Sequence, residues 1–146
     1  MLGVVVAENL DVKTTFLHVD LEEEIYMEKP KGFVASNQEH LVCRLMKSLY
    51  GLKQAPRQWY QKFDNFIQSI GFSKSDENHC LFTKTTQDGS PIFLIIYVDD
   101  MLISGRHVGE LAELILQLQL KIFMKDLGSA WHILGMKISR NSNQRQ

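Results

Sequence analysis

The fold is decided by residues 92–103, IFLIIYVDDMLI. Two runs of β-forming residues, Pro91–Val98 and Met101–Gly105, flank the adjacent aspartates Asp99 and Asp100. Charged residues between two buried strands can be accommodated only at a tight reversal, so the stretch predicts a β-hairpin with both carboxylates at its tip. The first run is almost entirely apolar, which predicts a central strand covered on both faces.

Upstream of this hairpin the sequence predicts another strand and a helix. Residues 80–84 favour a strand, joined to the hairpin across a strong turn signal at residues 88–89. The helix is expected over Ala55–Ile70, with Pro56 near its start and Gly71 just past its end. Its apolar residues repeat at helical spacing: Trp59, Phe63, Phe66, Ile67 and Ile70.

Downstream, the sequence predicts a second helix over Val108–Phe123 and a last strand over Ile133–Ser139. The apolar face of that helix is formed by Leu111, Leu114, Ile115, Leu118 and Ile122. The polar residues 141–146 are expected to form a frayed tail.

Three further strands are expected near the start of the chain, over residues 11–17, 25–27 and 41–45. The resulting order is strand, helix, hairpin, helix, strand, with connections long enough for two helices to cover one face of a sheet. This order predicts an α+β fold of the split βαβ kind, with an antiparallel, ferredoxin-like sheet.

The composition is that of a globular chain of 146 residues, with 45% apolar residues and a formal net charge of −1. A nucleic-acid partner must therefore be met through a local basic patch. Cys43 and Cys80 have no zinc-ligand or disulfide spacing, which fits a reducing, intracellular compartment. No apolar run approaches the ~20 residues of a membrane helix, so no membrane association is expected.

Acidic residues suggest a metal site. If the strand over residues 11–17 lies beside the hairpin, Asp11 joins Asp99 and Asp100 in a cluster of three carboxylates. Mg²⁺ prefers such oxygen ligands, and two ions held by one cluster can serve in-line phosphoryl transfer. The alternative is that the two adjacent aspartates are simply a polar hairpin turn.

A basic segment between His40 and Phe63 suggests contact with a nucleic-acid backbone or a triphosphate. It contains no acidic residue, and its cations are Arg44, Lys47, Lys53, Arg57 and Lys62. The alternative is a solvated helix face, on which Trp59 belongs to the core.

Six blocks of sequence, in order, resemble the reverse transcriptase of copia-type LTR retrotransposons. They are DVKTTFL at 11–17, LEEEIYM at 21–27, KSLYGLKQAPRQWY at 47–60, YVDDMLI at 97–103, FMKDLG at 123–128 and ILGMKI at 133–138. Residues 4–10 resemble the helix that precedes the first block in that family. Val19 stands where the family has glycine, which predicts a strained turn there.

The resemblance implies a role for particular residues in template-directed addition of dNTPs to a primer 3′-OH. Asp11, Asp99 and Asp100 would be the catalytic carboxylates. Together with the backbone carbonyl of Val12 they would hold two Mg²⁺ or Mn²⁺ ions. The nucleotide would be contacted by Phe16, Tyr50, Gly51, Lys53 and Lys125. The primer and template would be contacted by Arg57, Tyr97, Gly135 and Met136.

The resemblance also implies a single truncated reverse transcriptase domain. Residues 11–17 and 51–140 would form a polymerase palm, and residues 18–50 a remnant of the fingers. The partners would be an RNA or DNA template with its primer and dNTPs, with integrase and RNase H in the parent polyprotein. The protein would be intracellular, in a cytoplasmic virus-like particle or in the nucleus.

Three interpretations of function remain open from the sequence. The first is the palm of an RNA-directed DNA polymerase, inactive in isolation. The second is a non-enzymatic relic, or an adopted nucleic-acid- or protein-binding domain from a decayed retrotransposon. The third, a metal-dependent phosphohydrolase, needs only the carboxylates and ignores residues 47–60.

Overall fold

The computed structural model describes residues 6–34, 36–38, 40–133 and 135–138. The chain divides into two compact units, one formed by Thr14–Lys62 and the other by the chain up to Lys13 and from Phe63 onward. Residues 141–146, expected to fray, lie outside the described residues. Within the described part of the chain, no helix has the length and apolar character that crossing a bilayer requires.

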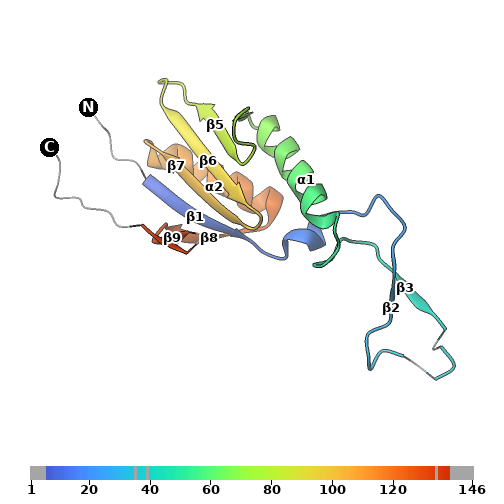
Figure 1. Ribbon diagram of the computed structural model, residues 1–146. Helices are drawn as coiled ribbons and strands as arrows, with labels where there is room; N and C mark the ends of the chain where they lie inside the picture. Colours follow the sequence, from blue (N-terminus) through green and yellow to red (C-terminus); the bar gives the residue numbers. More distant parts are fainter. Residues whose placement is uncertain (1–5, 35, 39, 134, 139–146) are drawn as a thin grey trace. The chain divides into compact units, whose positions relative to one another are not determined.

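The unit that includes the hairpin is built on a six-stranded sheet, in which all neighbouring strands are antiparallel (Figure 1). The strand order is β4-β5-β6-β7-β1-β8. These strands are β1 (Val6–Val12), β4 (Ser73–Lys74), β5 (Leu81–Thr85), β6 (Pro91–Tyr97), β7 (Asp100–Gly105) and β8 (Met124–Ser129). The α+β class and the antiparallel sheet predicted from the sequence are therefore confirmed.

Helix α2 (Val108–Ile122) covers one face of this sheet, and all five residues of its predicted apolar face are buried. Helix α1 (Ala55–Ser69) contributes Phe63, whose ring packs edge-on against Phe82 of β5 at 5.7 Å between centroids. Phe82 pairs with Leu94, so both side chains lie on the helix-covered face. Trp59 is buried, in agreement with the core alternative.

The opposite face of the sheet is open, which corrects the expectation that β6 is covered on both faces. Exposure alternates along β6: Ile92, Leu94 and Ile96 are buried, whereas Phe93 and Ile95 are about 40% exposed. Both helices pack on the same side, and the apolar run therefore reflects one buried face and one uncovered apolar face.

The first strand begins earlier in the chain than the predicted range of residues 11–17. It spans Val6–Val12, pairing with β7 from Val6↔Gly105 to Asp11↔Asp100, so Asp11 lies at the end of a strand. Residues 6–10 are therefore extended, although residues 4–10 resemble a helix. The chain turns at Thr14, whose φ is 49°, and the 3-10 helix η1 (Thr15–His18) takes the place of the predicted strand.

Two other expectations about the backbone are corrected. Val19 has φ −103°, an ordinary extended conformation, so it carries no strain. The predicted strand over Ile133–Ser139 is a short hairpin of β9 (His132–Ile133) and β10 (Met136–Lys137). Gly135, at φ 77°, supplies the positive φ that reverses the chain between them.

β8 was not predicted as a strand. Helix α2 ends at Phe123, which adopts the left-handed conformation at φ 57°, and the chain then returns along β1. β8 contributes residues to both faces of the sheet, because Lys125 pairs with Asp11 and Asp126 pairs with the buried Leu10.

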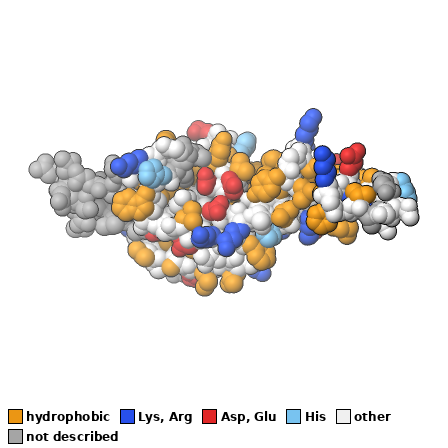
Figure 2. Space-filling view, turned by 90° about the horizontal axis from the view of Figure 1, so that it is seen from below, with side chains coloured by type: hydrophobic (Ala, Val, Ile, Leu, Met, Phe, Trp, Pro, Cys, Tyr) orange, Lys and Arg blue, Asp and Glu red, His pale blue; other side chains and the backbone are white. Residues whose placement is uncertain are grey.

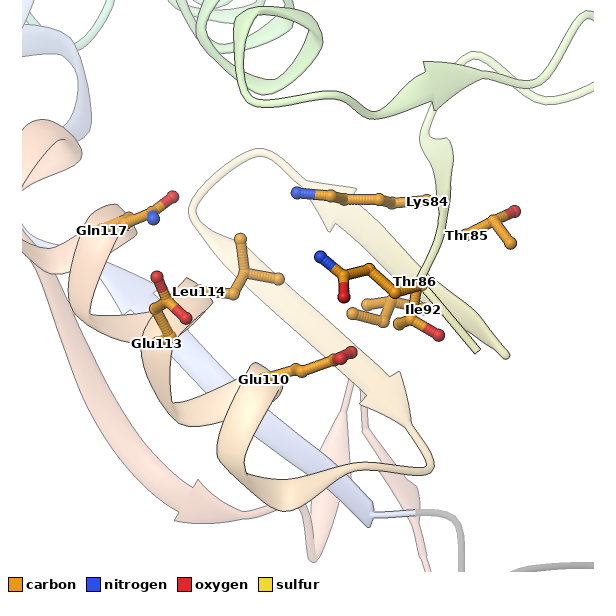
Figure 3. A pocket seen from close by; sticks show the side chains of 9 residues that line it. Lys84, Thr85, Thr86, Ile92, Glu110, Glu113, Leu114 and Gln117 are labelled. Carbon is orange, nitrogen blue, oxygen red and sulfur yellow. The ribbon is translucent and has the colours of Figure 1, made fainter. Parts of the chain in front are cut away.

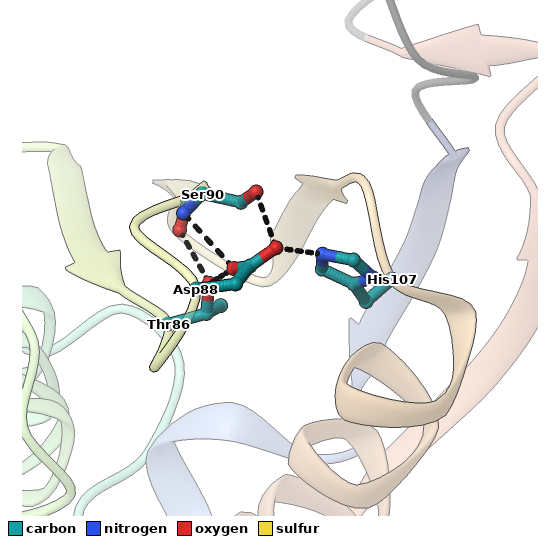
Figure 4. A network of polar contacts seen from close by, with 4 residues as sticks. All are labelled: Thr86, Asp88, Ser90 and His107. Atoms are coloured by element: carbon teal, nitrogen blue, oxygen red, sulfur yellow. Dashed lines mark hydrogen bonds and ion pairs between the residues drawn. The ribbon is translucent and has the colours of Figure 1, made fainter.

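Polar contacts of Asp88 join the β5–β6 turn to the start of α2 (Figure 4). Its carboxylate accepts hydrogen bonds from Thr86, from the Ser90 amide at 3.1 Å and hydroxyl at 3.0 Å, and contacts His107 Nε2 at 2.7 Å. These contacts hold the pKa of Asp88 far below its usual value, with the Thr86 hydrogen bond as the largest cause.

The second unit contains a separate hairpin of β2 (Tyr26–Glu28) and β3 (Val42–Arg44), close to the predicted short strands. Arg44 Nη2 lies 2.9 Å from Glu24 Oε1, and Lys47 forms an ion pair with Asp20. Two cations of the predicted basic segment are therefore paired with nearby carboxylates.

Candidate metal centre

The hairpin between β6 and β7 reverses through Val98 and Asp99, and Asp100 is the first residue of β7. Only Asp99 therefore lies in the turn itself, whereas Asp100 belongs to the ladder. Val98 adopts φ 56°, which is unusual for a β-branched residue. The Val12 amide donates a 3.0 Å hydrogen bond to the Asp99 carbonyl, which ties the turn to the end of β1.

Strand pairing places Asp11 directly opposite Asp100. Residues directly opposite in an antiparallel ladder project from the same face, so both carboxylates lie on the open side of the sheet. Tyr97, 58% exposed, is the partner of Asp100 on the other side and shares this face. A group of acidic side chains is visible near the middle of the face drawn in Figure 2.

The electrostatics of Asp100 reflect this proximity. Partial burial is the largest cause that raises the pKa of its carboxyl, and the charges of Asp99 and then Asp11 raise it further. Asp100 is therefore close enough to Asp99 and to Asp11 for their charges to disfavour its ionised form. Among the described residues, no three acidic, thiol or imidazole groups converge tightly enough to hold a metal ion as they stand.

Lys125 is the cation beside this group. It is exposed on β8, directly opposite Asp11, and therefore lies on the same open face. The row of facing residues across three strands is Asp100, Asp11 and Lys125.

Asn9 is a member of this face that the sequence did not single out. It lies two residues before Asp11 on β1, and its Oδ1 is buried with no hydrogen-bond partner. Residues i and i+2 of a strand share a face, so the signal was present. It was missed because the strand was expected to begin at Asp11.

The remaining predicted site residues are distributed over other parts of the fold. Phe16 is buried in η1 and packs edge-on against the exposed ring of Tyr50 at 4.6 Å between centroids. Gly51 has φ 96°, and a Cβ there would meet nothing within 4 Å, so its glycine is required by backbone conformation. Lys53 and Arg57 are exposed around the start of α1.

These four groups (Phe16, Tyr50 with Gly51, Lys53, Arg57) belong to the Thr14–Lys62 unit, whereas the carboxylates belong to the sheet. Gly135 forms the β9–β10 turn, and Met136 is 60% exposed beside it.

Comparison with known proteins shows the family. A sequence model described as reverse transcriptase (RNA-dependent DNA polymerase) matches residues 3–146. This chain belongs to the reverse transcriptase family. The retrovirus-related Pol polyprotein from transposon TNT 1-94 of Nicotiana tabacum is 54% identical over 139 residues, which are 95% of the chain and 10% of that protein.

Two further relatives support a copia-type retrotransposon origin. The Pol polyprotein from transposon RE1 of Arabidopsis thaliana is 37% identical over 90% of the chain and 9% of its own length. A putative transposon Ty5-1 protein of Saccharomyces cerevisiae is 37% identical over 92% of the chain and 43% of its own length. The chain thus spans about a tenth of the plant polyproteins. No solved structure matches.

Proposed function

We propose that the open face of the sheet is the palm of an RNA-directed DNA polymerase, which adds dNTPs to a primer 3′-OH on an RNA or DNA template. The observation that carries the proposal is the placement of Asp11 opposite Asp100, with Asp99 in the adjoining turn, in a chain of the reverse transcriptase family.

The three carboxylates supply the kind of ligand that a pair of divalent cations requires. Hard oxygen donors are the ligands that Mg²⁺ and Mn²⁺ take. Burial, and then the charges of Asp99 and Asp11, raise the pKa of Asp100, and a cation on this face would offset that repulsion. Asp side chains have two rotatable bonds, so half-buried carboxylates on one face can turn toward a common ion.

In this proposal Asp11, Asp99, Asp100 and the Val12 carbonyl hold the two ions. Bound there, the ions would activate the primer hydroxyl and offset the charge of the triphosphate. Lys125, beside Asp11, would donate a proton to the leaving pyrophosphate. Tyr97 would pack against the primer end from the same face.

The assignments of the remaining site residues rest on their match to the family motifs. Phe16, Tyr50, Gly51 and Lys53 would line the nucleotide pocket, and Phe16 would disfavour a ribose 2′-hydroxyl. Arg57, Gly135 and Met136 would contact template and primer. The proposal includes an intracellular location, in a virus-like particle or the nucleus.

We also propose that these 146 residues polymerise inefficiently in isolation. Four of the five residues assigned to the nucleotide belong to a different compact unit from the residues assigned to the metal, and the exception is Lys125. Much of the rate of phosphoryl transfer comes from holding the reactants in position, so efficient synthesis requires both sets of residues to be held around the primer end and the dNTP.

Primer extension on poly(rA)/oligo(dT) with Mg²⁺ or Mn²⁺ tests both statements. We expect weak synthesis that is abolished in Asp99→Asn. Robust synthesis dependent on Asp99 would support the polymerase and contradict the inefficiency. Synthesis unaffected by Asp99→Asn would contradict the metal site.

A further inference from the structure

We propose that helix α2 presents a docking groove for a basic amphipathic helix of a partner protein. The inference is independent of the proposed polymerase site, because the groove lies on the helix-covered side of the sheet. Glu8 pairs with the buried Ile103 and Asp126 with the buried Leu10, so both acids project toward that side.

The groove is a hollow of about 450 Å³ between α2, β1 and β8. Its floor is formed by Leu111 and Ile115, which are almost fully buried. Val108 and Leu116 line it and are 63% and 55% exposed. Large aliphatic side chains held half in water on one helix favour contact with another apolar surface.

An apolar stripe continues beyond the hollow along α2. Val108, Ala112, Leu116 and Leu120 follow at intervals of four residues, and Leu120 is 70% exposed. Residues four apart lie above one another on a helix, so the stripe runs the length of α2. A small molecule would need only the hollow, whereas a stripe of this length fits an elongated partner such as a helix.

Carboxylates lie on both sides of the stripe. Glu8 and Asp126 line the groove on one flank, and among the described residues neither forms an ion pair with Lys, Arg or His. On the other flank, Glu110 and Glu113 line a second hollow of about 270 Å³ beside β5 and β6 (Figure 3). The one cation of that second hollow, Lys84, donates a 2.8 Å hydrogen bond to the Ile70 carbonyl.

The acidic residues on both sides of the stripe favour a basic partner. Lys121, in the last turn, is the only basic residue of α2, so the first three turns of the stripe are bordered by acids. Complementarity therefore calls for apolar side chains on one face of the partner helix and Lys or Arg along its edges. The same acids disfavour an anionic lipid surface.

The test uses the full 146-residue chain and a fluorescein-labelled 16-residue peptide with leucine on one face and lysine along both edges. Anisotropy should report saturable binding that weakens with salt. Leu116→Glu should weaken binding about tenfold or more, since it removes the burial of a leucine and places a charge in an apolar contact. Met46→Glu, which adds the same charge at an exposed apolar residue of the other unit, should leave binding unchanged.

Further variants separate the charge contribution from the fold. Glu8→Gln and Asp126→Asn should weaken binding a few-fold and reduce its salt dependence. If Leu116→Glu loses its circular dichroism signal and is therefore unfolded, Leu116→Ala replaces it in the binding measurement. Absence of binding, equal binding of a peptide with glutamate in place of lysine, or unchanged binding by the Leu116 variants would overturn the proposal. Self-association through Leu116 would also overturn it, because the occupant would then be a second copy.

Discussion

The position of Asp100 makes its ionisation unfavourable. It faces Asp11 across the ladder and follows Asp99 in the chain. Like charges directly opposite in a sheet are destabilising, and burial adds to the cost of ionising Asp100. The facing carboxylates therefore lower the local stability of the sheet.

Replacing Asp100 by Asn should stabilise the chain in the absence of divalent cations. The gain at neutral pH is expected to be about 0.2–1 kcal/mol, the range for cross-strand pairs. Because the pKa of Asp100 is raised on folding, its ionisation penalty is full at high pH and disappears as pH falls below the unfolded value of 3.8.

Urea denaturation of wild type and Asp100→Asn in EDTA, at neutral pH and at pH 3, measures this difference. Asp126→Asn, on the other side of the sheet, provides the matched control. A variant that is less stable than wild type at neutral pH in EDTA would show that the Asp100 charge is already compensated.

Asp64 illustrates the opposite case. Its burial raises the carboxyl pKa, but hydrogen bonds from Lys74 at 2.7 Å and Gln68 at 2.7 Å outweigh burial and leave the pKa below its usual value. A lowered folded pKa contributes stability that is present above pH 3.8 and is lost as pH falls through the folded value.

We expect Asp64→Asn to lower the free energy of unfolding by about 1 kcal/mol at neutral pH, the net contribution of a typical intramolecular hydrogen bond. The loss should begin to shrink as pH falls below 3.8, and it should reach zero only below the lowered pKa of the folded state, where the wild-type carboxyl is itself protonated. Thermal unfolding of both proteins between pH 3 and pH 7 checks this. A loss that is the same at both ends of the range would mean that packing, not charge, is responsible.

At the scale of elements, the hairpin turn between β6 and β7 carries a conformational cost. Val98 adopts φ 56°, and the left-handed region costs an L-residue roughly 1–2 kcal/mol. Backbone strain of this kind clusters at functional sites, and in the proposed metal site the strained residue directly precedes Asp99.

Val98→Gly should therefore raise the free energy of unfolding by about 0.5–1 kcal/mol, since relief of strain exceeds the entropy cost of glycine. Chemical denaturation measures the change. Val42→Gly, in an ordinary strand position of β3, should instead destabilise. Destabilisation by both substitutions to the same extent would show that the Val98 turn is not strained.

The sequence predicted those elements whose apolar residues recur at a regular spacing within the element itself. α1 and α2 agree with their predicted ranges to within a residue, because one apolar face of each is buried and its spacing shows in the sequence. β1 and β8 could not be placed in this way. Their position depends on pairing with β7 and with each other, which is a long-range property.

The candidate site was predictable in part for the same reason. The hairpin with the adjacent aspartates 99–100 could be predicted from the charged residues between two apolar runs. The pairing with Asp11 depended on which strand lies beside β7. The facing position of Lys125 required the register, and no local pattern encodes it. Asn9 shares the face of Asp11 by its spacing alone, once the strand is known to begin at Val6.

At the scale of the whole molecule, the open face of the sheet exposes adjacent apolar side chains. Phe93, Ile95 and Tyr97 project from β6 on the side that no described helix covers. Single exposed apolar residues are ordinary, but adjacent ones on a flat sheet favour association.

Ile95→Lys should reduce self-association of the isolated chain without loss of its fold, since this side chain is 40% exposed. Light scattering over a concentration series, with circular dichroism as the check on folding, measures the effect. Leu120→Lys, on α2, adds the same charge elsewhere. A larger decrease in scattering for Leu120→Lys would assign the association to the helix instead.

If Asp11, Asp99 and Asp100 bind divalent cations together, titration of the chain with Mn²⁺, monitored by electron paramagnetic resonance, will detect the binding directly. We predict saturable Mn²⁺ binding that Mg²⁺ displaces, greatly weakened in Asp11→Asn and in Asp99→Asn, and unchanged in Asp126→Asn. Mn²⁺ binding that survives both substitutions, or that is absent from the wild-type chain, would contradict the account.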